Sequence, residues 1–247
     1  MIFIYLLDCA KKNTKNLRNI DYPGRLIIIG VSPSGEKILQ LYCTMGRSEN
    51  SRSRKLANIC GVVSTVPLGY TKDMENTELL IYSIARQVQN YHIVSNGLQT
   101  DTVAEYVSKN RCFEDALLTW KHEHDAPIYT PRISGIIEVC KDSLHYVYKL
   151  SIIKAAESNP TESTHYIFRY NYVMPGVAHC IHTYSPEGIC QPYKGEPFVV
   201  TTFDDLEQTI DYYWDLMPHD KRIGMYCKMI DISTGKFVEI IKNQIPD

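Results

Sequence analysis

The chain has 247 residues, of which 44% are hydrophobic and 22% charged, and its formal net charge is -2. This balance is typical of a globular protein with enough core to fold unaided, and it argues against a general affinity for nucleic acid or an anionic membrane. The eight cysteines include no CxxC pair. They therefore indicate no disulfide framework, but reduced, mostly buried thiols in a cytoplasmic protein.

The N-terminal segment, residues 2–7, is a short apolar run that ends at Asp8. It is too short to span a bilayer, and it lacks the basic region and the small-residue cleavage site of a signal peptide. We therefore expect this segment to form a helix or a strand that docks on the core.

Strand-like patterns dominate the first hundred residues. Residues 25–31 and 36–44 flank a turn sequence at 32–35, which predicts a β-hairpin. The stretch from Gly30 to Lys37 also looks like a phosphate-binding loop, but its lysine comes one place late and a strand pattern follows, so we interpret it as the hairpin turn. Further short strands fit residues 59–66, 78–84 and 92–95.

The pattern changes to a helical period after residue 100. Residues 101–108 and 113–120 each place apolar side chains on one helical face, and Thr100 or Asp101 is suited to cap the first of these helices. Strand patterns then return, with one more helix among them. The later strands are expected at 133–140, 145–154, 166–173, 177–184, 225–232 and 236–241, and the helix at 203–216.

Many short strands with few helices predict an α+β fold with largely antiparallel sheets. Two sheets packed face to face, with helices on their outer faces, would bury all the apolar stripes. No linker-like segment divides the chain, so we expect a single domain spanning residues 1–247.

An arginine-rich loop and two polar runs are the candidate ligand-binding segments. The loop, residues 46–54, mixes Arg47, Arg52 and Arg54 with serine and asparagine. Such a run is commonly a solvated loop, but arginine forks beside small hydrogen-bonding side chains also suit phosphate oxygens. The polar runs at 94–102 and 129–133 carry hydroxyls, amides, an acid and an arginine beside apolar segments. Each has the pattern of a well-capped turn, but together they favour a small, anionic, polyhydroxylated ligand, which we take to be a purine nucleotide.

Two histidine pairs, His122 with His124 and His179 with His182, suggest a metal only weakly, because no third ligand has suitable spacing. We predict no metal and no cofactor. Glu123 is of more interest as a carboxyl group near a cleft, where burial can raise its pKa into the range of general acid/base catalysis. No GxSxG motif occurs, and bulky Ile2 follows Met1, so covalent catalysis is not expected.

These residues, in this order, resemble the archaeal-type IMP cyclohydrolases, a family with bacterial members. The resemblance covers residues 22–135 and thins beyond, where the run from His179 to Tyr184 is the remaining landmark. The motifs that carry it are Tyr22-Pro23-Gly24-Arg25, residues 46–52, Tyr82 with Arg86, Ser95-Asn96-Gly97 with Thr100-Asp101-Thr102, Glu123 with Asp125, and Thr130-Pro131-Arg132-Ile133.

The resemblance implies a four-layer αββα sandwich similar to the N-terminal nucleophile hydrolases, without their nucleophile. It also implies closure of 5-formamidoimidazole-4-carboxamide ribonucleotide (FAICAR) to IMP and water, the last step of purine synthesis, without metal or cofactor. By the same analogy the protein is a cytoplasmic homo-oligomer, a tetramer, with no nucleic-acid or membrane partner. Residues 1–21 are then an N-terminal extension.

The resemblance further implies roles for individual residues. Tyr82 would donate to or polarise the leaving oxygen, Glu123 would accept the amide proton, and Arg52 completes the catalytic candidates. The substrate-binding candidates are Arg47, Asn50, Asn96, Gly97, Thr100, Asp101 and Arg132. Tyr129 stands where the archaeal proteins have asparagine, and about one extra residue separates Asp125 from Thr130.

Two alternatives remain open from the sequence. The first is a nucleotide-binding sensor or scaffold that kept the pocket without the chemistry; retention of both Tyr82 and Glu123 argues against it. The second is an amidohydrolase on the same fold with another substrate, which would need a nucleophile that the sequence does not offer.

Overall fold

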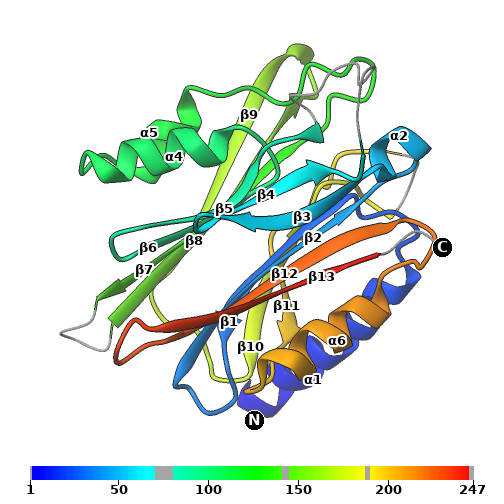
Figure 1. Ribbon diagram of the computed structural model, residues 1–247. Helices are drawn as coiled ribbons and strands as arrows, with labels where there is room; N and C mark the ends of the chain where they lie inside the picture. Colours follow the sequence, from blue (N-terminus) through cyan, green and yellow to red (C-terminus); the bar gives the residue numbers. More distant parts are fainter. Residues whose placement is uncertain (1, 70–79, 141–144, 187–189, 245–247) are drawn as a thin grey trace.

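The computed structural model describes residues 2–69, 80–140, 145–186 and 190–244. Within them, two antiparallel β-sheets face each other and helices cover their outer faces (Figure 1). This arrangement confirms the prediction of an α+β fold with two facing, largely antiparallel sheets.

The six-stranded sheet contains the predicted hairpin of β1 (Arg25–Val31) and β2 (Lys37–Met45). Ser32 N–H donates to Lys37 O at 2.9 Å, and Gly35 has a φ of 78°, which glycine adopts readily. The stretch that looks like a phosphate loop is therefore a hairpin turn, as predicted. The other strands are β10 (Val177–His182), β11 (Phe198–Thr201), β12 (Arg222–Asp231) and β13 (Phe237–Asn243), and the spatial order is β11-β10-β1-β2-β12-β13.

The seven-stranded sheet runs in sequence order from β3 to β9. Its strands are β3 (Arg54–Ile59), β4 (Val62–Pro67), β5 (Ser83–Val88), β6 (Tyr91–Ser95), β7 (Arg132–Cys140), β8 (His145–Ala156) and β9 (Asn159–Tyr170). Several details differ from the sequence prediction, among them β9, which starts at Asn159 instead of residue 166. Arg54 belongs to a strand instead of the arginine-rich loop, the strand expected at 59–66 begins after a turn at Cys60-Gly61, and β11 was not expected. The strand expected at 78–84 begins outside the described residues, and β5 starts only at Ser83.

Helices lie on the outer faces of the two sheets (Figure 1). Helices α1 (Ile2–Asn16) and α6 (Leu206–Leu216) cover the six-stranded sheet, while α4 (Gln99–Ser108) and α5 (Phe113–Leu118) cover the other. The N-terminal segment is thus a helix. The capping prediction was wrong: α4 begins at Gln99 after Leu98, so Thr100 and Asp101 lie in its first turn. Two short elements, η1 (Leu17–Asn19) and α2 (Glu49–Arg52), complete the set among the described residues.

Apolar side chains fill the space between the sheets and the space between each sheet and its helices. Successive side chains of a strand point to opposite faces, so a strand covered on both faces is apolar throughout. Every residue of β1 is buried for this reason. Its sequence therefore shows a continuous apolar run instead of an alternation.

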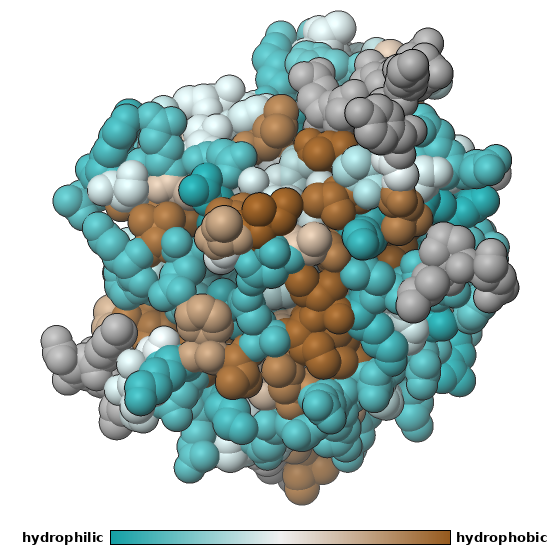
Figure 2. Space-filling model, viewed as in Figure 1, coloured by the Kyte–Doolittle hydropathy of each residue, from teal (hydrophilic) through white to brown (hydrophobic). Residues whose placement is uncertain are grey.

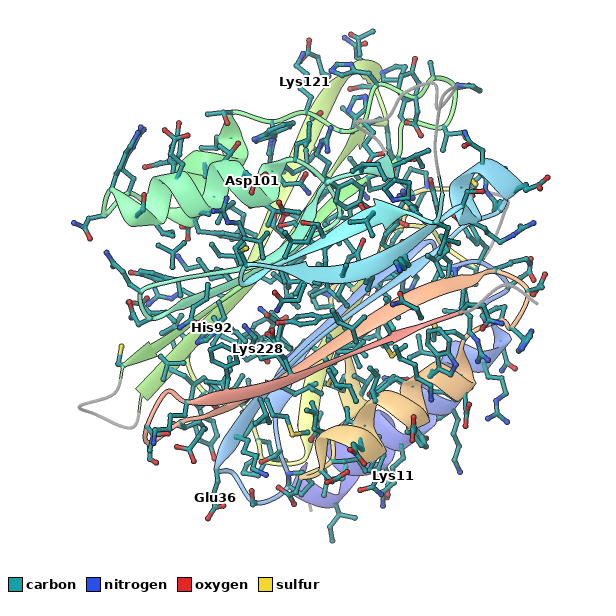
Figure 3. All side chains as sticks on the ribbon, viewed as in Figure 1. Lys11, Glu36, His92, Asp101, Lys121 and Lys228 are labelled. Carbon is teal, nitrogen blue, oxygen red and sulfur yellow. The ribbon has the colours of Figure 1, made fainter. Side chains whose placement is uncertain are left out.

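A few polar side chains are buried between the two sheets. Figure 3 shows His92 of β6 and Lys228 of β12 in this interior, and both are buried. Lys228 Nζ lies 3.3 Å from Glu239 Oε2, so its charge is paired. Four of the eight cysteines, Cys43, Cys180, Cys190 and Cys227, are buried thiols.

The edge strands β3 and β13 lie next to each other. The Asn243 side chain bonds both Leu56 N–H (2.8 Å) and Leu56 O (3.0 Å), and Asn58 donates to Glu239 at 2.7 Å. Ile59 and Val238 are exposed along these edges. Figure 2 shows apolar side chains gathered near the middle of this otherwise largely hydrophilic face. No helix within the described ranges is long and apolar enough to cross a membrane.

Candidate functional site

A cleft of about 410 Å³ opens where strands of both sheets end, at the same end of the molecule as α2. It lies at the start of β1, after β2, before β5, before β7 and after β10. The lining residues are Tyr22, Arg25, Arg47, Ser48, Ser51, Leu80, Glu123, Asp125, Thr130 and Tyr184. Segments far apart in the sequence therefore contribute polar side chains to one site.

The loop before β7 holds Glu123 at the cleft. Glu123 N–H donates to Thr130 O at 3.0 Å, and Asp125 accepts from Thr130 N–H at 2.7 Å and from Thr130 Oγ1 at 2.5 Å. Thr130 Oγ1 also lies 2.6 Å from the Tyr184 hydroxyl, which ties the loop to the other sheet. These contacts fix a carboxyl group that is only 3% exposed.

Burial raises the pKa of Glu123 to about 7, although Arg25 and Arg132 act in the opposite direction. The Arg132 guanidinium lies 4.0 Å from the Glu123 carboxyl group. A carboxyl group with this pKa exists in both protonation states near neutral pH. It is therefore able to give or to take a proton there.

Tyr82 lies next to the cleft and is 4% exposed. Its hydroxyl is 3.2 Å from that of Tyr42, and the Arg54 guanidinium lies 6.0 Å from its ring centre. Burial alone would raise the pKa of Tyr82, but Arg25, Arg54 and the hydrogen bond with Tyr42 outweigh burial and lower it. The pKa of Tyr42 is raised well above its ordinary value, mainly by burial and then by Tyr82. Tyr82 is thus the more acidic of the two phenols.

Two buried arginines flank this pair. Arg25 is 7% exposed and Arg54 is 1% exposed, and Arg54 Nη1 donates to Leu80 O at 2.7 Å. Arg25 Nε, Arg54 Nε and Arg54 Nη2 have no hydrogen-bond partner among the described residues. Buried donors are normally bonded, so these three leave room for an acceptor that the described residues do not supply. An anionic ligand fits that requirement.

Several predicted site residues do meet at this cleft. Glu123 and Arg47 line it, and Tyr82 and Arg132 lie close behind. The Arg47 guanidinium lies 5.2 Å from the ring centre of Tyr22, which in turn stacks on Tyr184 with ring centres 5.5 Å apart.

The other predicted site residues do not line the cleft. Asn50 and Arg52 are exposed on α2, where Arg52 Nη1 donates to Arg47 O at 2.9 Å. Asp101, in the first turn of α4 (Figure 3), pairs with Arg86 at 2.7 Å. Their roles in binding or catalysis therefore stay predictions.

The predicted turn at residues 95–100 uses its polar groups within the protein. Asn96 is fully buried; its side chain donates to Pro131 O at 2.9 Å and accepts from Ile133 N–H at 2.8 Å. Thr100 Oγ1 donates to Gly97 O at 2.8 Å. A Cβ atom on Gly97 would lie 2.5 Å from Arg132 Nη1. This turn therefore shapes the surroundings of Arg132, and direct substrate contact by its residues stays a prediction.

The sequence had not indicated site roles for Arg25 and Tyr42, and it had placed Arg54 only within the candidate phosphate-binding loop. Arg25 opens a fully apolar strand, and Arg54 opens β3. A lone arginine at the end of a buried strand is a usable signal, because a buried cation needs a partner. Nothing in the local sequence marks Tyr42, since it stands in an ordinary strand pattern.

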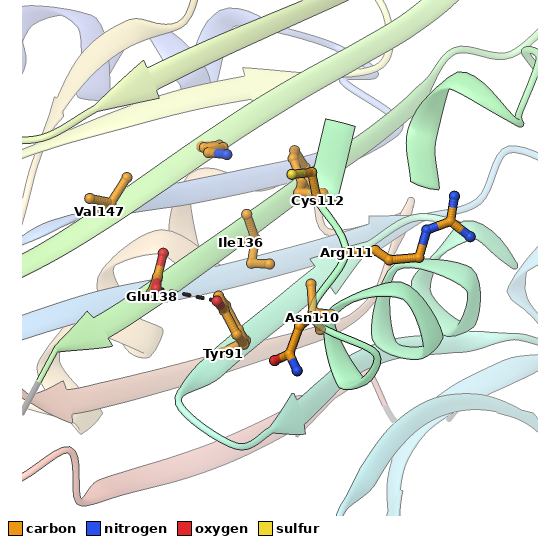
Figure 4. Close-up of a pocket in the computed structure, with 10 residues that line it drawn as sticks. Tyr91, Asn110, Arg111, Cys112, Ile136, Glu138 and Val147 are labelled. Carbon is orange, nitrogen blue, oxygen red and sulfur yellow. Dashed lines mark hydrogen bonds between the residues drawn. The ribbon is translucent and has the colours of Figure 1, made fainter. Parts of the chain in front are cut away.

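Another hollow, of about 210 Å³, lies between the α4–α5 connection and the seven-stranded sheet (Figure 4). Its charged side chains bond within the protein: Tyr91 donates to Glu138 at 3.2 Å, and Lys149 pairs with Glu114 at 2.5 Å. It contains none of the predicted site residues. The cleft with unsatisfied arginine donors is therefore the better candidate for a functional site.

Three of the four histidines that raised the question of a metal bond to other groups of the protein. His122 Nδ1 lies 2.7 Å from Ser163 Oγ, His179 Nδ1 lies 2.6 Å from the Tyr148 hydroxyl, and His182 Nδ1 lies 2.7 Å from Tyr184 O. Across the part of the chain that the structure describes, no group of three or more His, Cys, Asp or Glu residues is arranged to hold a metal ion.

The fold and the cleft together define a two-sheet α+β protein with two buried titratable groups of shifted pKa, Glu123 and Tyr82, close to buried arginines. The family model for IMP cyclohydrolase-like protein matches residues 22–235, and the chain belongs to that family. The resemblance predicted from the motifs is thereby confirmed, and it extends well beyond residue 135. The IMP cyclohydrolase of Methanosphaera stadtmanae is 28% identical over 159 residues, which are 62% of this chain and 76% of that relative.

Proposed function

We propose that this protein is an IMP cyclohydrolase that closes FAICAR to IMP with loss of water. The observation that carries the proposal is the placement of Glu123 and Tyr82 beside Arg25 and Arg54 at one cleft. Membership of the IMP cyclohydrolase-like family supports the same reaction. A site that only bound a nucleotide would have no use for a carboxyl group with a pKa of about 7 next to an acidified tyrosine.

The cleft has the charges and surfaces that a purine nucleotide requires. Arg47 and Arg54 supply positive charge for a phosphate group, and guanidinium donors bind phosphate oxygens strongly. The stacked rings of Tyr22 and Tyr184 offer an aromatic surface for a heterocycle. Arg52 bonds to the carbonyl of Arg47, and we retain it as a further candidate beside the phosphate.

The reaction is intramolecular and balances without another reactant. The carboxamide nitrogen attacks the formyl carbon, the new C–N bond closes the ring, and the former formyl oxygen becomes a hydroxyl group that leaves as water. The attacking carboxamide nitrogen loses one proton on ring closure, the formamido nitrogen loses another as the C–O bond breaks, and the departing oxygen gains both. Holding the two groups in contact supplies much of the acceleration.

Glu123 and Tyr82 are the groups proposed to move these protons. The ionised Glu123 carboxylate accepts a proton from the nitrogen, and the Tyr82 hydroxyl donates one to the leaving oxygen. Arg25, the cation with the largest effect on the pKa of both Tyr82 and Glu123, stabilises the negative charge that develops on the oxygen or on Tyr82. No step in this scheme needs a metal or an organic cofactor.

We further propose a fold relationship, a cellular location and an oligomeric state for this protein. The layers of helices and sheets fit the four-layer αββα sandwich of N-terminal nucleophile hydrolases, and we propose that relationship for the fold. We also propose one domain across residues 1–247, a cytoplasmic location and a homo-oligomer, with four subunits as the expected number. Light scattering on the purified protein measures the number of subunits.

The deciding experiment is an ultraviolet assay of FAICAR conversion to IMP by purified protein in the presence of EDTA. Turnover that survives chelation supports a metal-independent cyclohydrolase. A protein that binds IMP, measured as a rise in Tm, without any turnover would instead be a nucleotide sensor or scaffold. Absence of both turnover and IMP binding would overturn the proposed function.

A further inference from the structure

We propose a second ligand site in this protein, for a small organic anion, centred on Lys154 and separate from the cleft. It occupies a hollow of about 660 Å³, called here the Lys154 pocket. Its lining residues are Pro127, Ile128, Lys154, Ala155, Ala156, Glu157, Pro160, Cys190, Gln191, Pro192 and Lys194. This inference goes beyond the proposed cyclohydrolase reaction and does not depend on it.

Lys154 is a buried cation on the wall of an open pocket. It lies on β8 and is 8% exposed. Its ammonium group donates to Tyr193 O at 3.3 Å and lies 5.0 Å from the ring centre of Tyr166. No carboxylate of the described residues forms an ion pair with it. A buried ammonium group is costly without an ion-paired anion. Burial lowers the pKa of Lys154, Glu157 opposes this shift from a distance, and Lys194 adds to it.

Other buried cations of the described residues either pair with a carboxylate or lie beside the proposed anion site. Lys228, the second buried lysine among the described residues, pairs with Glu239 at 3.3 Å. Within the described residues Arg25 and Arg54 have no carboxylate contact within 4.0 Å; Arg25 lines the cleft where an anionic substrate is proposed, and Arg54 bonds to Leu80 of its lining. Lys154 is similar to Arg25 and Arg54, because it has no ion-paired carboxylate and lines an open hollow. We infer that the occupant of the Lys154 pocket supplies the missing negative charge.

The remaining lining defines the chemical class of that occupant. Prolines, alanines and Ile128 make up most of the wall, and Lys194 is a second cation near the opening, 3.5 Å from Glu157. One buried cation in an apolar wall suits a carboxylate or phosphate group attached to a small apolar body. A highly charged polymer would need more exposed cations than these two.

The Lys154 pocket and the cleft lie on the two sides of one loop. Pro127 and Ile128 line the pocket, while Asp125 and Thr130 of the same loop line the cleft. Cys190 lines the pocket and also interacts electrostatically with Arg47 and Asp125 of the cleft. The two sites are therefore adjacent but have no lining residue in common.

The test is calorimetric titration with phenyl phosphate, repeated with benzoate, in the absence and presence of saturating IMP. We expect the wild-type protein to bind with IMP present, Lys154→Met to weaken binding about tenfold or more, and Lys109→Met to leave it unchanged. Lys109 is an exposed lysine directly after α4, paired with Glu105, and controls for the lost charge. A preference between the two compounds distinguishes a phosphate from a carboxylate ligand.

Three results would overturn the site: no binding to the wild type, equal binding by Lys154→Met, or binding that IMP abolishes. If IMP itself does not bind, the proposed function is in doubt, but the comparison of wild type with Lys154→Met still tests the pocket.

Thermal unfolding gives a second readout. Without ligand, Lys154→Met should raise Tm by a few degrees, because it removes a buried charge that lacks a carboxylate and keeps the length of the side chain. Phenyl phosphate should narrow this difference by stabilising only the wild type. A lower Tm for Lys154→Met without ligand would show that the protein itself compensates the charge, contrary to the proposal.

Discussion

The hydroxyl groups of Tyr42 and Tyr82 lie 3.2 Å apart between the two sheets, with Arg25 and Arg54 beside Tyr82. The two arginines favour the ionised form of Tyr82, so Tyr42 is the partner that donates the shared hydrogen. Glu123 is the other titratable group facing Tyr82, and its negative charge opposes ionisation of the phenol. Tyr42 therefore supports Tyr82 without itself touching the cleft lining.

Replacing Tyr42 by phenylalanine should raise the pKa of Tyr82, because the phenolate of Tyr82 loses a donor. Ultraviolet difference titration of each protein against its Tyr82→Phe counterpart isolates this phenol from the other tyrosines. The matched control is Tyr148→Phe, which removes another buried hydroxyl, bonded to His179 at 2.6 Å away from the cleft. If Tyr42→Phe and Tyr148→Phe leave the Tyr82 titration equally unchanged, Tyr42 is only a packing residue.

Tyr82→Phe should lower kcat by about 10²- to 10⁴-fold, the usual contribution of a positioned proton donor, with little change in IMP affinity. The ring remains, so packing against Arg54 is kept, and only the hydroxyl is lost. Steady-state kinetics with FAICAR measures kcat, and calorimetry with IMP measures the binding affinity. Equal losses in kcat and in affinity would make Tyr82 a binding residue.

Glu123 should make the folded protein less stable as pH rises. Its pKa is about 7 when folded, above the ordinary value of 4.5, so the folded state favours the protonated form. The stability from this group is complete at low pH and falls as pH rises toward 7, by about 3 kcal/mol in total. Glu123→Gln imitates the protonated form and should therefore be the more stable protein at about pH 8, with a much smaller gain at about pH 5.

Chemical denaturation of both proteins at the two pH values measures this difference. The same variant should be nearly inactive, because glutamine accepts no proton. A stability gain that does not depend on pH would mean that Glu123 is ionised and compensated by Arg25 and Arg132 in the folded protein.

Substitutions of Arg54 and of Arg52 together test which arginine binds the phosphate group of the nucleotide. Arg54 is buried with two unsatisfied donors, whereas Arg52 is exposed and bonds to Arg47 O. Arg54→Met should weaken IMP binding by about 1.5–3 kcal/mol, the range for hydrogen bonds to a charged group, and Arg52→Ala should weaken it less. Neither should affect inosine, which lacks the phosphate. Equal weakening of IMP and inosine would remove that arginine from the phosphate site.

The sequence was sufficient for elements whose pattern is local. The β1–β2 hairpin, α4, α5 and the two-sheet arrangement follow from periodicity and turn residues. The site was only partly predictable, since Arg25, Tyr42 and Arg54 come from three strands that meet through sheet topology. Asn96 and Thr100 were predicted to bind substrate, but their side chains bond to backbone carbonyls of the protein. The sequence cannot separate these two cases, because a polar side chain in a turn has the same pattern in both.

Gly97 tests whether the turn at residues 95–100 acts on the site through Arg132. A Cβ atom at this position would lie 2.5 Å from Arg132 Nη1 and 2.6 Å from Gln99 Oε1, and these two atoms bond each other at 3.1 Å. Gly97→Ala should therefore displace the Arg132 guanidinium, which lies 4.0 Å from the Glu123 carboxyl group. Because Arg132 lowers the pKa of Glu123, its displacement should raise that pKa.

The acid limb of the pH–rate profile should then move to higher pH, with a modest loss of kcat. The glycine at position 61 is the matched control, because a Cβ atom there meets nothing within 4 Å, although its φ of 84° makes Gly61→Ala strained. Gly61→Ala should thus lower Tm without moving the pH profile. If Gly97→Ala lowers Tm and leaves the acid limb in place, the turn contributes only to folding, and Arg132 does not set the protonation of Glu123.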